Sequence, residues 1–542
     1  MKFFNLRMAF AWILSIPAVY VALGFLGNYY IVFFEIVLIT IMVEIIVSLL
    51  FYCLLEKADQ LYSSRVSDLV LALALFMVLS IFVGGMFDAA IRFPRLFDVR
   101  VVFLEIGQIN PFLVGSVFAL PILMFTLKQF DITQTYAYHY VSEIATGIAI
   151  AAFFFVVYFI FASIFNRPAF DVDDIFFDSD GLLWRTRFTT EVYRDYYWRS
   201  VHPFALLLIR PLVALVSFFL KGDKLSGAFV LIAFSGALCV FLTWFFVKRT
   251  VGNSLYASLI ASLLGASAAH LVFGSLIETY IFLAAVIMIF LVLLLKDTSL
   301  FVLILTGLVS FGITITNFVQ TVIALIFVRR DLKQWIKYMM IVGALAIPLA
   351  LLNNFIYPNS QPYFFIPSGL SKEAGNTFTP SAGRGLAAVR VMFFHSIVAP
   401  DPLILREEIP FLKVWIFKAD PMRLSEYRTS LGTFVAYDWL ALLFLGGFLF
   451  LKDLKKVDNR FPFAFILILL FNFMIHLRYG KDLFLYSTNW VYALILFLAF
   501  AWKELADKRW FQIALLGFLV LLLANNSRLI FTMLSVSALH IK

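Results

Sequence analysis

Charged residues are scarce in this chain. Only 14% of its 542 residues are Asp, Glu, Lys or Arg, whereas 63% are hydrophobic. Soluble domains carry about 25% charged and about 45–50% apolar residues. A folded core cannot bury such an excess of apolar side chains but lipid can, so a string of soluble domains is excluded. Apolar runs of about 20 residues, the length of a membrane-crossing helix, recur instead and predict an all-α polytopic membrane protein.

Cysteine is nearly absent, since Cys53 and Cys239 are the two in the sequence and both lie inside apolar runs. This placement excludes a disulfide framework and a cysteine metal site. The formal charge of +9 does not indicate a nucleic-acid partner, because Lys and Arg cluster in short segments between apolar runs, where they orient helices. No small-residue cleavage site follows the first run, so we expect it to be an anchor and not a signal peptide.

About fifteen apolar runs predict membrane spans. They cover residues 8–27, 31–55, 67–86, 111–127, 142–165, 225–247, 254–273, 279–295, 299–315, 317–328, 337–353, 431–451, 461–477, 489–502 and 511–525. A cytoplasmic N-terminus places the short segments rich in Lys and Arg inside, as the positive-inside rule requires, although Arg92, Arg95 and Arg100 then fall outside.

The same register places three polar segments outside the membrane. They lie near residues 166–224, 354–430 and 478–489. We therefore expect a multi-pass protein of the plasma (inner) membrane, with its active site on the extracytoplasmic face.

The richest polar stretch is the first outside segment. Residues 171–180 hold five aspartates, and arginines and aromatic residues follow up to Arg199. Carboxylates can take a proton or hold a divalent cation, and arginines can clamp phosphate. Residues 191–197 place charged and tyrosine side chains at helical spacing, which predicts an amphipathic helix on the membrane surface. The simpler explanation is that any loop leaving a membrane is polar and aromatic.

Two motifs in this segment resemble the GT-C superfamily of membrane glycosyltransferases. Residues 177–181 (FDSDG) are similar to the acidic pair in the family's first outside loop, and residues 200–203 (SVHP) to its His-Pro motif. Phe204 stands where the family usually has a second proline. Further along, residues 276–280 (LIETY) and 484–487 (FLYS) resemble outside segments of the family.

The resemblance covers about residues 142 to 525 and implies a fold. The expected fold is a GT-C-like helical bundle of about eleven core spans, preceded by about four spans without a counterpart in the family. The implied domains are 1–135, N-terminal accessory transmembrane helices, and 136–542, a catalytic domain. Its outside loops are expected to carry short amphipathic helices.

The resemblance also implies an activity. GT-C enzymes pass a sugar from a polyprenyl-phosphate donor to an extracytoplasmic lipid or glycan acceptor, usually with inversion at the anomeric carbon. Asp178 or Asp180 is then the general base that deprotonates the acceptor, and the sequence does not choose between them. The other carboxylate is expected to orient the acceptor or to bind a divalent cation, which some members need and others do not.

Further residues are expected to bind substrate, because a leaving phosphate is stabilised by cationic donors aimed at it. The candidates are Arg187, His202, Glu278, Arg384, Arg390, Lys481 and Tyr486. Glu278 ends an apolar run, where a carboxylate is unfavourable unless it faces water or a partner. The alternatives are headgroup contact for the cations, helix capping for His202 and an interfacial position for Tyr486.

Two other classes of membrane protein fit parts of this pattern. A transporter or flippase of lipid-linked saccharides would bury ionisable groups in the spans, often in two repeated halves. Here the spans carry few charges, no repeat is visible, and carboxylates gather in one loop. A surface-glycan polymerase or ligase would depend mainly on arginines in outside loops, so replacing Asp178 and Asp180 would separate that class from a GT-C enzyme.

Overall fold

The structure of the chain, a computed structural model, consists mainly of α-helices. It describes residues 6–129, 131–194, 199–406, 409–416, 422–455 and 458–541, apart from the side chains of Ser64 and Lys372. The chain forms two compact units: Met1–Ile81 with Ile91–Phe153, and Phe82–Ala90 with Phe154–Lys542. We describe each unit by itself. The expected division into accessory helices and a catalytic domain stays a prediction.

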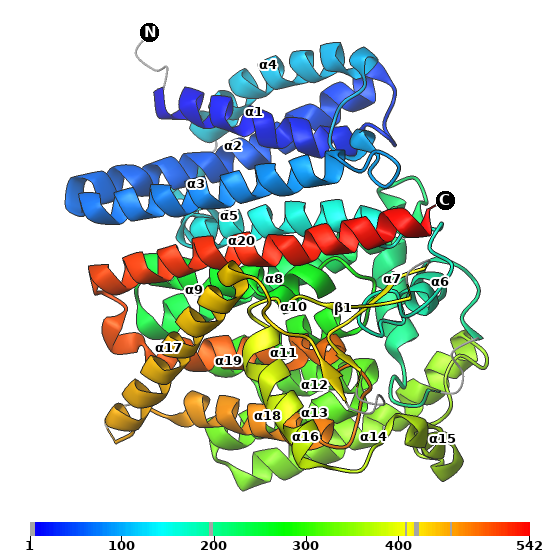
Figure 1. Cartoon of the computed structure of the whole chain (residues 1–542). Coiled ribbons are helices and arrows are strands. Elements are labelled where there is room, and N and C mark those ends of the chain that lie inside the picture. The colour runs from blue at the N-terminus through cyan, green and yellow to red at the C-terminus, as the bar shows by residue number, and fades with distance from the viewer. Residues whose placement is uncertain are drawn as a thin grey trace. The chain divides into compact units, whose positions relative to one another are not determined.

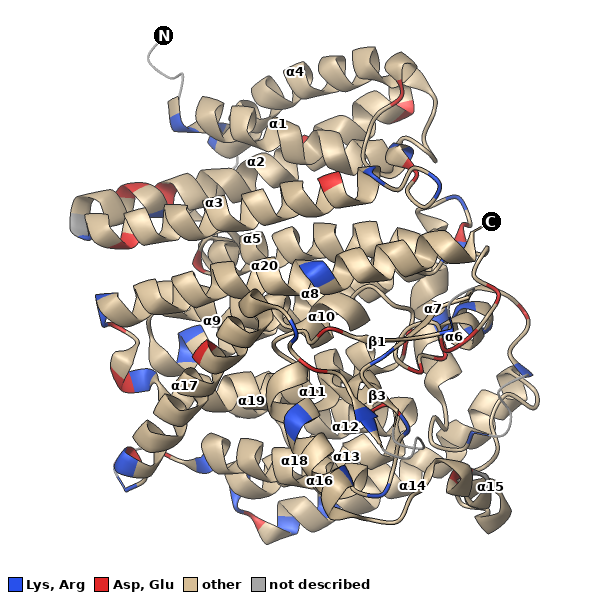
Figure 2. Ribbon diagram, viewed as in Figure 1, with Lys and Arg blue, Asp and Glu red and all other residues tan. Residues whose placement is uncertain are grey.

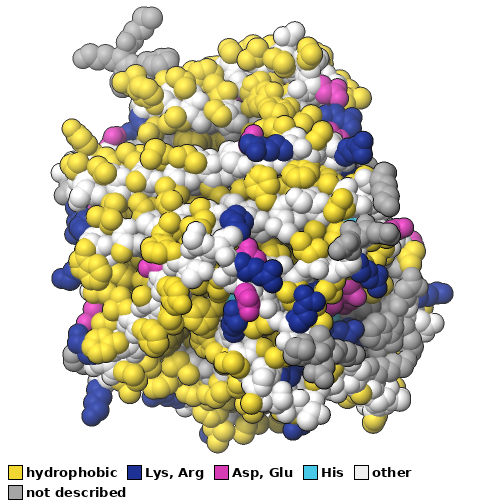
Figure 3. All heavy atoms as spheres, viewed as in Figure 1, with side chains coloured by type: hydrophobic (Ala, Val, Ile, Leu, Met, Phe, Trp, Pro, Cys, Tyr) yellow, Lys and Arg dark blue, Asp and Glu magenta, His cyan; other side chains and the backbone are white. Residues whose placement is uncertain are grey.

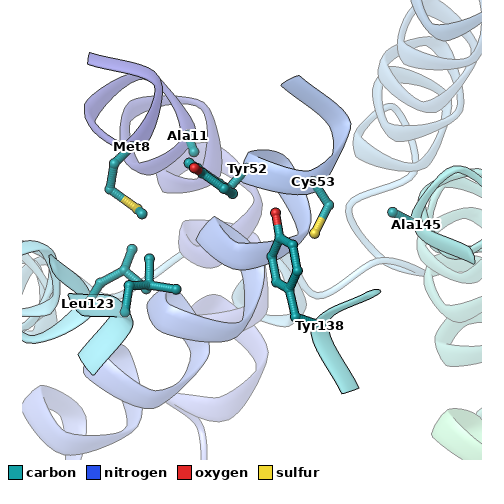
Figure 4. Close-up of a cluster of buried hydrophobic side chains, with 8 residues drawn as sticks. Met8, Ala11, Tyr52, Cys53, Leu123, Tyr138 and Ala145 are labelled. Carbon is teal, nitrogen blue, oxygen red and sulfur yellow. The ribbon is translucent and has the colours of Figure 1, made fainter. Parts of the chain in front are cut away.

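The first unit is a bundle in which α2 packs against both α1 and α4 (Figure 1). Its elements are α1 (Leu6–Leu26), α2 (Phe33–Ser64), most of α3 (Val66–Ile91), η1 (Val99–Val101), α4 (Ile106–Gln129), η2 (Ile132–Gln134) and the first part of α5 (Tyr136–Phe165). Figure 4 shows one of its buried apolar clusters, to which α1 contributes Met8, α2 contributes Tyr52 and Cys53, and α4 contributes Leu123.

Helices α2 and α4 approach each other closely where Gly115 meets Thr40. A Cβ atom at position 115 would lie 2.6 Å from the Thr40 Cβ atom, so a larger residue would push the helices apart. Small residues at such contacts are typical of helix pairs in membranes. The residues next to Gly115 in α4 and next to Thr40 in α2 are thereby held close to the opposite helix.

The second unit contains the remainder of α3 and α5 and all later elements. Its helices are α6 (Gly181–Thr189), α7 (Ala205–Phe218), α8 (Lys224–Val251), α9 (Ser254–Ala266), α10 (Ala268–Phe273), α11 (Tyr280–Leu295), α12 (Leu300–Ile313), α13 (Ile315–Arg329), α14 (Leu332–Ile356), α15 (Pro367–Ser371), η4 (Lys372–Asn376), α16 (Ala382–Arg390), η5 (Val391–His395), α17 (Ser430–Asp453), α18 (Arg460–His476), η6 (Leu483–Tyr486), α19 (Thr488–Ala501), η7 (Lys503–Leu505) and α20 (Arg509–His540). Helices α8 and α19 contact each other, and both contact α9 and α11; these four helices form its centre.

Two small antiparallel sheets interrupt the helices of this unit. Strand β1 (Leu403–Leu405) pairs with β2 (Phe411–Lys413), and β3 (Trp415–Ile416) pairs with β4 (Arg423–Leu424). Strand β2 has a second neighbour, because Leu412 forms a parallel bridge with Phe176 of the acidic segment. The sheet therefore joins residues 403–413 to the acidic segment that precedes α6.

Nine helices within the described ranges are long and apolar enough to cross a membrane, and further apolar helices have 10–17 residues. The prediction of an all-α multi-pass membrane protein is confirmed at this level. The number of spans and the GT-C-like arrangement stay predictions. The expected run 254–273 is divided in the structure, because the extended backbone of Ser267 ends α9 and its hydroxyl accepts the His270 N–H at the start of α10.

Charges and apolar side chains are distributed as lipid contact requires. Figure 2 shows Lys, Arg, Asp and Glu mainly at helix ends and in loops, with long uncharged stretches of helix between them. Figure 3 shows many hydrophobic side chains exposed on the visible face. The exposed hydrophobic residues of the chain include Phe34, Ile46 and Phe444, which are 79%, 66% and 70% exposed. Exposed apolar surface on this scale indicates contact with lipid and not with water.

Candidate active site

The acidic segment between α5 and α6 has a defined backbone conformation. Asp174, Phe177 and Asp178 have positive φ angles of 67°, 59° and 60°. Few residues other than glycine adopt this region, so neighbouring contacts must hold the segment in place. The Phe177 N–H donates to the Leu412 carbonyl of β2 at 2.8 Å, and the buried Phe177 ring lies 4.9 Å from that of Phe484. The carboxylates of this segment are therefore fixed from two sides.

Asp178 forms an ion pair with Lys413, the last residue of β2. Because Leu412 pairs with the acidic segment, the strand brings the following Lys413 ammonium directly to this carboxylate. The two side chains are 18% and 11% exposed. Asp178 is thus a largely buried carboxylate with a dedicated cation.

Asp180 lies at the N-terminus of α6 and keeps a 24% exposed side chain. Its backbone N–H donates to Oε1 of Glu278 at 2.5 Å, and its Oδ2 lies 3.9 Å from Nη1 of Arg199. The α6 N-terminus is capped by another residue, since Asp173 accepts the N–H groups of Leu182 and Leu183. The side chain of Asp180 is therefore not used to cap its own helix.

Arg199 is held in a closed hydrogen-bonded triad. Its Nε donates to Oε1 of Glu373 at 3.0 Å, and its Nη2 donates to the Tyr479 hydroxyl at 3.1 Å. The Tyr479 hydroxyl in turn donates to Oε2 of Glu373 at 2.9 Å. The side chains of Arg199 and Glu373 are 8% and 11% exposed. The triad fixes a buried guanidinium next to the Asp180 carboxylate.

Burial shapes the proton affinity of the carboxyl groups around this pair. Burial raises the pKa of Glu278 well above its ordinary value, and the charge of Asp180 raises it further. Burial likewise raises the pKa of Asp174, against the lowering effect of Lys413. Burial and the charge of Asp178 raise the pKa of Asp482 to about 7, although its carboxylate accepts the N–H groups of Val414 and Trp415. The pKa values of these three carboxyl groups therefore all lie above their ordinary values.

Lys481 and Tyr486 belong to the same region. Lys481 is exposed and acts electrostatically on Asp174. Tyr486 is buried against the rings of Tyr280 at 5.1 Å and His476 at 4.7 Å. Burial raises its pKa, and the charges of Asp180 and Asp178 contribute to the rise. The structure therefore brings together Asp178, Asp180, Glu278, Lys481 and Tyr486 from the predicted set.

Arg384 borders this region, but its described contacts are with backbone. It donates to the carbonyl groups of residues 476, 477, 479 and 480 at 2.8–3.0 Å, where α18 ends. Its guanidinium also lies 4.9 Å from the rings of both Phe378 and Trp415. Burial lowers its pKa to about 10. These contacts hold the turn before Lys481, and a role in substrate binding stays a prediction.

Arg187 and His202 lie behind the site and also contact the backbone. Arg187 is fully buried and donates to the carbonyl groups of Tyr193 and Ser360. Nδ1 of His202 lies 2.6 Å from the Ile313 carbonyl, and burial lowers the pKa of His202 to about 3, so the ring is neutral. Both residues anchor neighbouring segments. Residues 195–197 of the amphipathic surface helix expected at 191–197 lie outside the described residues.

Arg390 lies in a different place, at a cavity of about 510 Å³ between α16 and the start of α17. Glu426 and Tyr427 line the same cavity, together with apolar side chains of α16 and α17. A second cavity, of about 280 Å³, is lined by Asp401, Asn525 and Arg528 among others. Neither cavity is lined by Asp178 or Asp180, so the structure does not bring Arg390 to the acidic pair.

A divalent cation was expected at Asp178 and Asp180 if anywhere. Within the described part of the chain, no three His, Cys, Asp or Glu side chains form a group that could hold a metal ion. Asp178 already has Lys413 as its cation, and Asp180 has Arg199 beside it. The donor set at the pair thus matches cation-paired carboxylates better than metal ligands.

Several residues of the site were not singled out from the sequence. They are Arg199, Glu373, Lys413, Tyr479 and Asp482. Asp482 carried a usable signal, because it is a carboxylate between Lys481 and the FLYS motif. Glu373 and Lys413 carried no such signal, because each is a single charge in a long polar segment. Only the fold brings these two residues close to residues 178–199.

No protein-family model, curated protein or solved structure matches the chain. The assignment of a function therefore rests on the residues of the site.

Proposed function

We propose that the protein is a membrane glycosyltransferase that moves a sugar from a polyprenyl-phosphate donor to an extracytoplasmic lipid or glycan acceptor. The observation that carries the proposal is the setting of Asp180. This partly exposed carboxylate lies at a helix N-terminus, 3.9 Å from a guanidinium that Glu373 and Tyr479 fix in place. A carboxylate that substrate can reach and that cannot reorient freely suits a general base.

Asp180 is a better candidate for the base than Asp178. Asp178 is less exposed, and its carboxylate is already engaged in an ion pair with the Lys413 ammonium. Asp180 lies farther from its cation and is more exposed, at 24% against 18%. In this assignment Asp178 and Lys413 position the loop, and Asp180 takes the proton.

The reaction would proceed in one displacement. The Asp180 carboxylate accepts the proton of an acceptor hydroxyl as its oxygen bonds to the anomeric carbon. The bond between that carbon and the phosphate oxygen breaks, and the electron pair stays on the phosphate. Lys481 is exposed at the same site and would stabilise this charge, while the buried Arg199 holds the Asp180 carboxylate in position.

The proposal is tested with purified protein in lipid vesicles. Radiolabelled polyprenyl-phosphate sugars are supplied with lipid and glycan acceptors, and both donor loss and labelled product are measured. We expect transfer by the native protein and by Asp171→Asn, an exposed aspartate of the same loop, but not by Asp180→Asn. No donor turnover with any common sugar, or full activity of Asp180→Asn, would refute the proposal. Movement of the intact donor across the vesicle membrane would favour a flippase instead.

The expected orientation has a separate test. Both native cysteines are buried, so a cysteine placed at the exposed Asp171 would be the main target of a membrane-impermeant maleimide. Labelling of Asp171→Cys from outside intact cells is expected. Labelling only after the cytoplasmic side is opened would invert the orientation.

A further inference from the structure

Helix α2 carries three polar side chains inside an otherwise apolar span. Thr40, Glu44 and Ser48 are spaced by four residues and therefore lie on one face of the helix. All three are fully buried. A carboxyl group in such a span is unfavourable unless it has partners, and it usually marks a functional position.

The partners of Glu44 come from three helices of the first unit. Its Oε1 is hydrogen-bonded to the hydroxyl of Ser15 in α1 and lies 3.5 Å from that of Ser48. Its Oε2 accepts the hydroxyl of Ser116 in α4 at 3.2 Å. Ser116 follows the glycine at which α4 meets α2, and its carbonyl accepts the Trp12 indole N–H at 2.9 Å. One carboxyl group is thus shared by α1, α2 and α4.

No cation faces this carboxyl group in the described residues. Its hydrogen-bonding side chains are the three serines, and no Lys, Arg, His or second carboxyl group acts on it from α1, α2 or α4. An ionised carboxylate without a cation is strongly disfavoured in an apolar environment and takes up a proton instead. The surroundings of Glu44 therefore favour its neutral form.

A protonated Glu44 and the surrounding serine hydroxyls can satisfy one another's hydrogen bonds. A protonated Glu44 donates through Oε1 to the Ser15 oxygen, and Ser15 donates its own proton to the Trp12 carbonyl at 2.7 Å. The Ser15 oxygen has a second lone pair, which accepts the Ser48 hydroxyl at 2.9 Å. Ser116 donates to Oε2. Every proton has an acceptor, and no net charge is left in the span.

We propose that Glu44, with Ser15, Ser48 and Ser116, forms a proton-binding site inside the membrane that holds a proton at neutral pH. Loss of this proton leaves a charge among three helices, so proton release is coupled to a rearrangement of α1, α2 and α4. The site is independent of the proposed sugar transfer. It assigns a specific chemical property to the N-terminal helices.

Infrared difference spectroscopy of the full chain in lipid tests this site. The spectrum of the native protein minus that of Glu44→Gln should show the C=O band of a protonated carboxylic acid at neutral pH. The matched control is Asp59→Asn, because Asp59 of the same helix is 64% exposed and paired with Arg7 at 2.7 Å. That variant should lose a carboxylate band instead. Loss of a carboxylate band in Glu44→Gln would overturn the proposal.

Thermal stability gives a second readout that does not depend on spectral assignment. Glu44→Gln keeps a neutral group that can donate to Ser15 and accept from Ser116, so its melting temperature should equal that of the native protein. Glu44→Ala leaves buried hydroxyls without partners and should melt at a lower temperature. Equal destabilisation by both variants would refute a neutral Glu44. Stabilisation of the native protein alone by Na⁺ would identify a metal-cation site and overturn the assignment to a proton.

Discussion

Buried carboxyl groups are stabilised in different ways in the two units. In the first unit, Glu44 is surrounded by serine hydroxyls and lacks a cation among the described residues. In the second unit, Asp178, Asp180 and Glu373 each lie next to Lys or Arg. Hydroxyl partners stabilise a carboxyl group that stays neutral, whereas Lys and Arg stabilise a charged carboxylate. The two units thus surround the same chemical group, a carboxyl, with different partners.

The two units also differ in how far protein covers their spans. Buried residues make up 33% of the most apolar window of α2 and 72% of that of α8. The side chains of α8 therefore contact mainly protein, while those of α2 are mostly open to lipid. Glu44 lies on the buried face of α2, where the three serine hydroxyls are its hydrogen-bonding side chains.

The largest expected effect is on sugar transfer, and it distinguishes Asp180 from Asp178. Asp180→Asn should lower sugar transfer by about 10² to 10⁴-fold, because a positioned base contributes about that much. Asp178→Asn should lower it less, through a shifted loop, and Glu44→Gln should leave it unchanged. Initial rates in lipid vesicles measure these effects, with melting curves to verify folding. A greater loss in Asp178→Asn than in Asp180→Asn would exchange the two roles.

Replacement of the buried Arg199 should cause the largest loss of stability among the single substitutions described here. Arg199→Ala leaves Glu373 charged and buried, which should lower the free energy of unfolding by about 3–5 kcal/mol. The exposed Arg194 supplies the matched control, since Arg194→Ala should have no effect. Glu373→Gln in the Arg199→Ala background should restore part of the loss, because it removes the unpaired charge. Denaturant titration in detergent measures all four proteins, and no recovery in the double variant would argue against the ion pair.

The pH dependence of stability should reveal Asp482. The folded protein holds this proton up to about pH 7, whereas the unfolded chain releases it near about pH 4. Between these values the unfolded state binds fewer protons, so stability should fall as the pH rises from about 4 to about 7 and then level off. The total loss should be at most about 4 kcal/mol. Melting curves over this range should show a shallower slope in Asp482→Asn than in the native protein, and an unchanged slope in Asp171→Asn.

The smallest effect concerns one hydroxyl around Glu44. Ser116→Ala removes a single neutral hydrogen bond and should destabilise the protein by about 1 kcal/mol. Ser80→Ala is the control, because Ser80 is exposed on α3 and bonds only to its own helix. Thermal unfolding in detergent compares the two. If Ser116→Ala destabilised the protein as strongly as Glu44→Ala, α4 would contribute more than a hydrogen bond.

The helices themselves could largely be predicted from the sequence. The expected run 279–295 corresponds to α11 (Tyr280–Leu295), and the run 337–353 lies within α14 (Leu332–Ile356). Long apolar stretches identify a helix in lipid because every backbone group must be satisfied within the segment. The break at Ser267 could not be predicted, since it lies among apolar and small residues and depends on one extended dihedral.

The candidate site could be predicted only in part. The carboxylates of residues 171–180 attract attention because they crowd together in the sequence. Tyr486 follows from the FLYS motif, and Lys481 from its place as a cation in the expected third outside segment. Lys413 and Glu373 lie about two hundred residues away, and no local pattern connects them to Asp178 and Arg199. Glu44 could have been noticed from the spacing of Thr40, Glu44 and Ser48, but its partners on α1 and α4 could not.

The sequence by itself determined that this chain is a bundle of apolar helices with its charges concentrated in loops, because composition and run length are local properties that lipid selects directly. Only the tertiary structure decided which carboxyl groups are paired with cations and which with hydroxyls. Ion pairs and hydrogen bonds act over a few ångströms, and those that matter here join residues far apart in the chain. The charge state of each carboxyl group therefore depends on the fold.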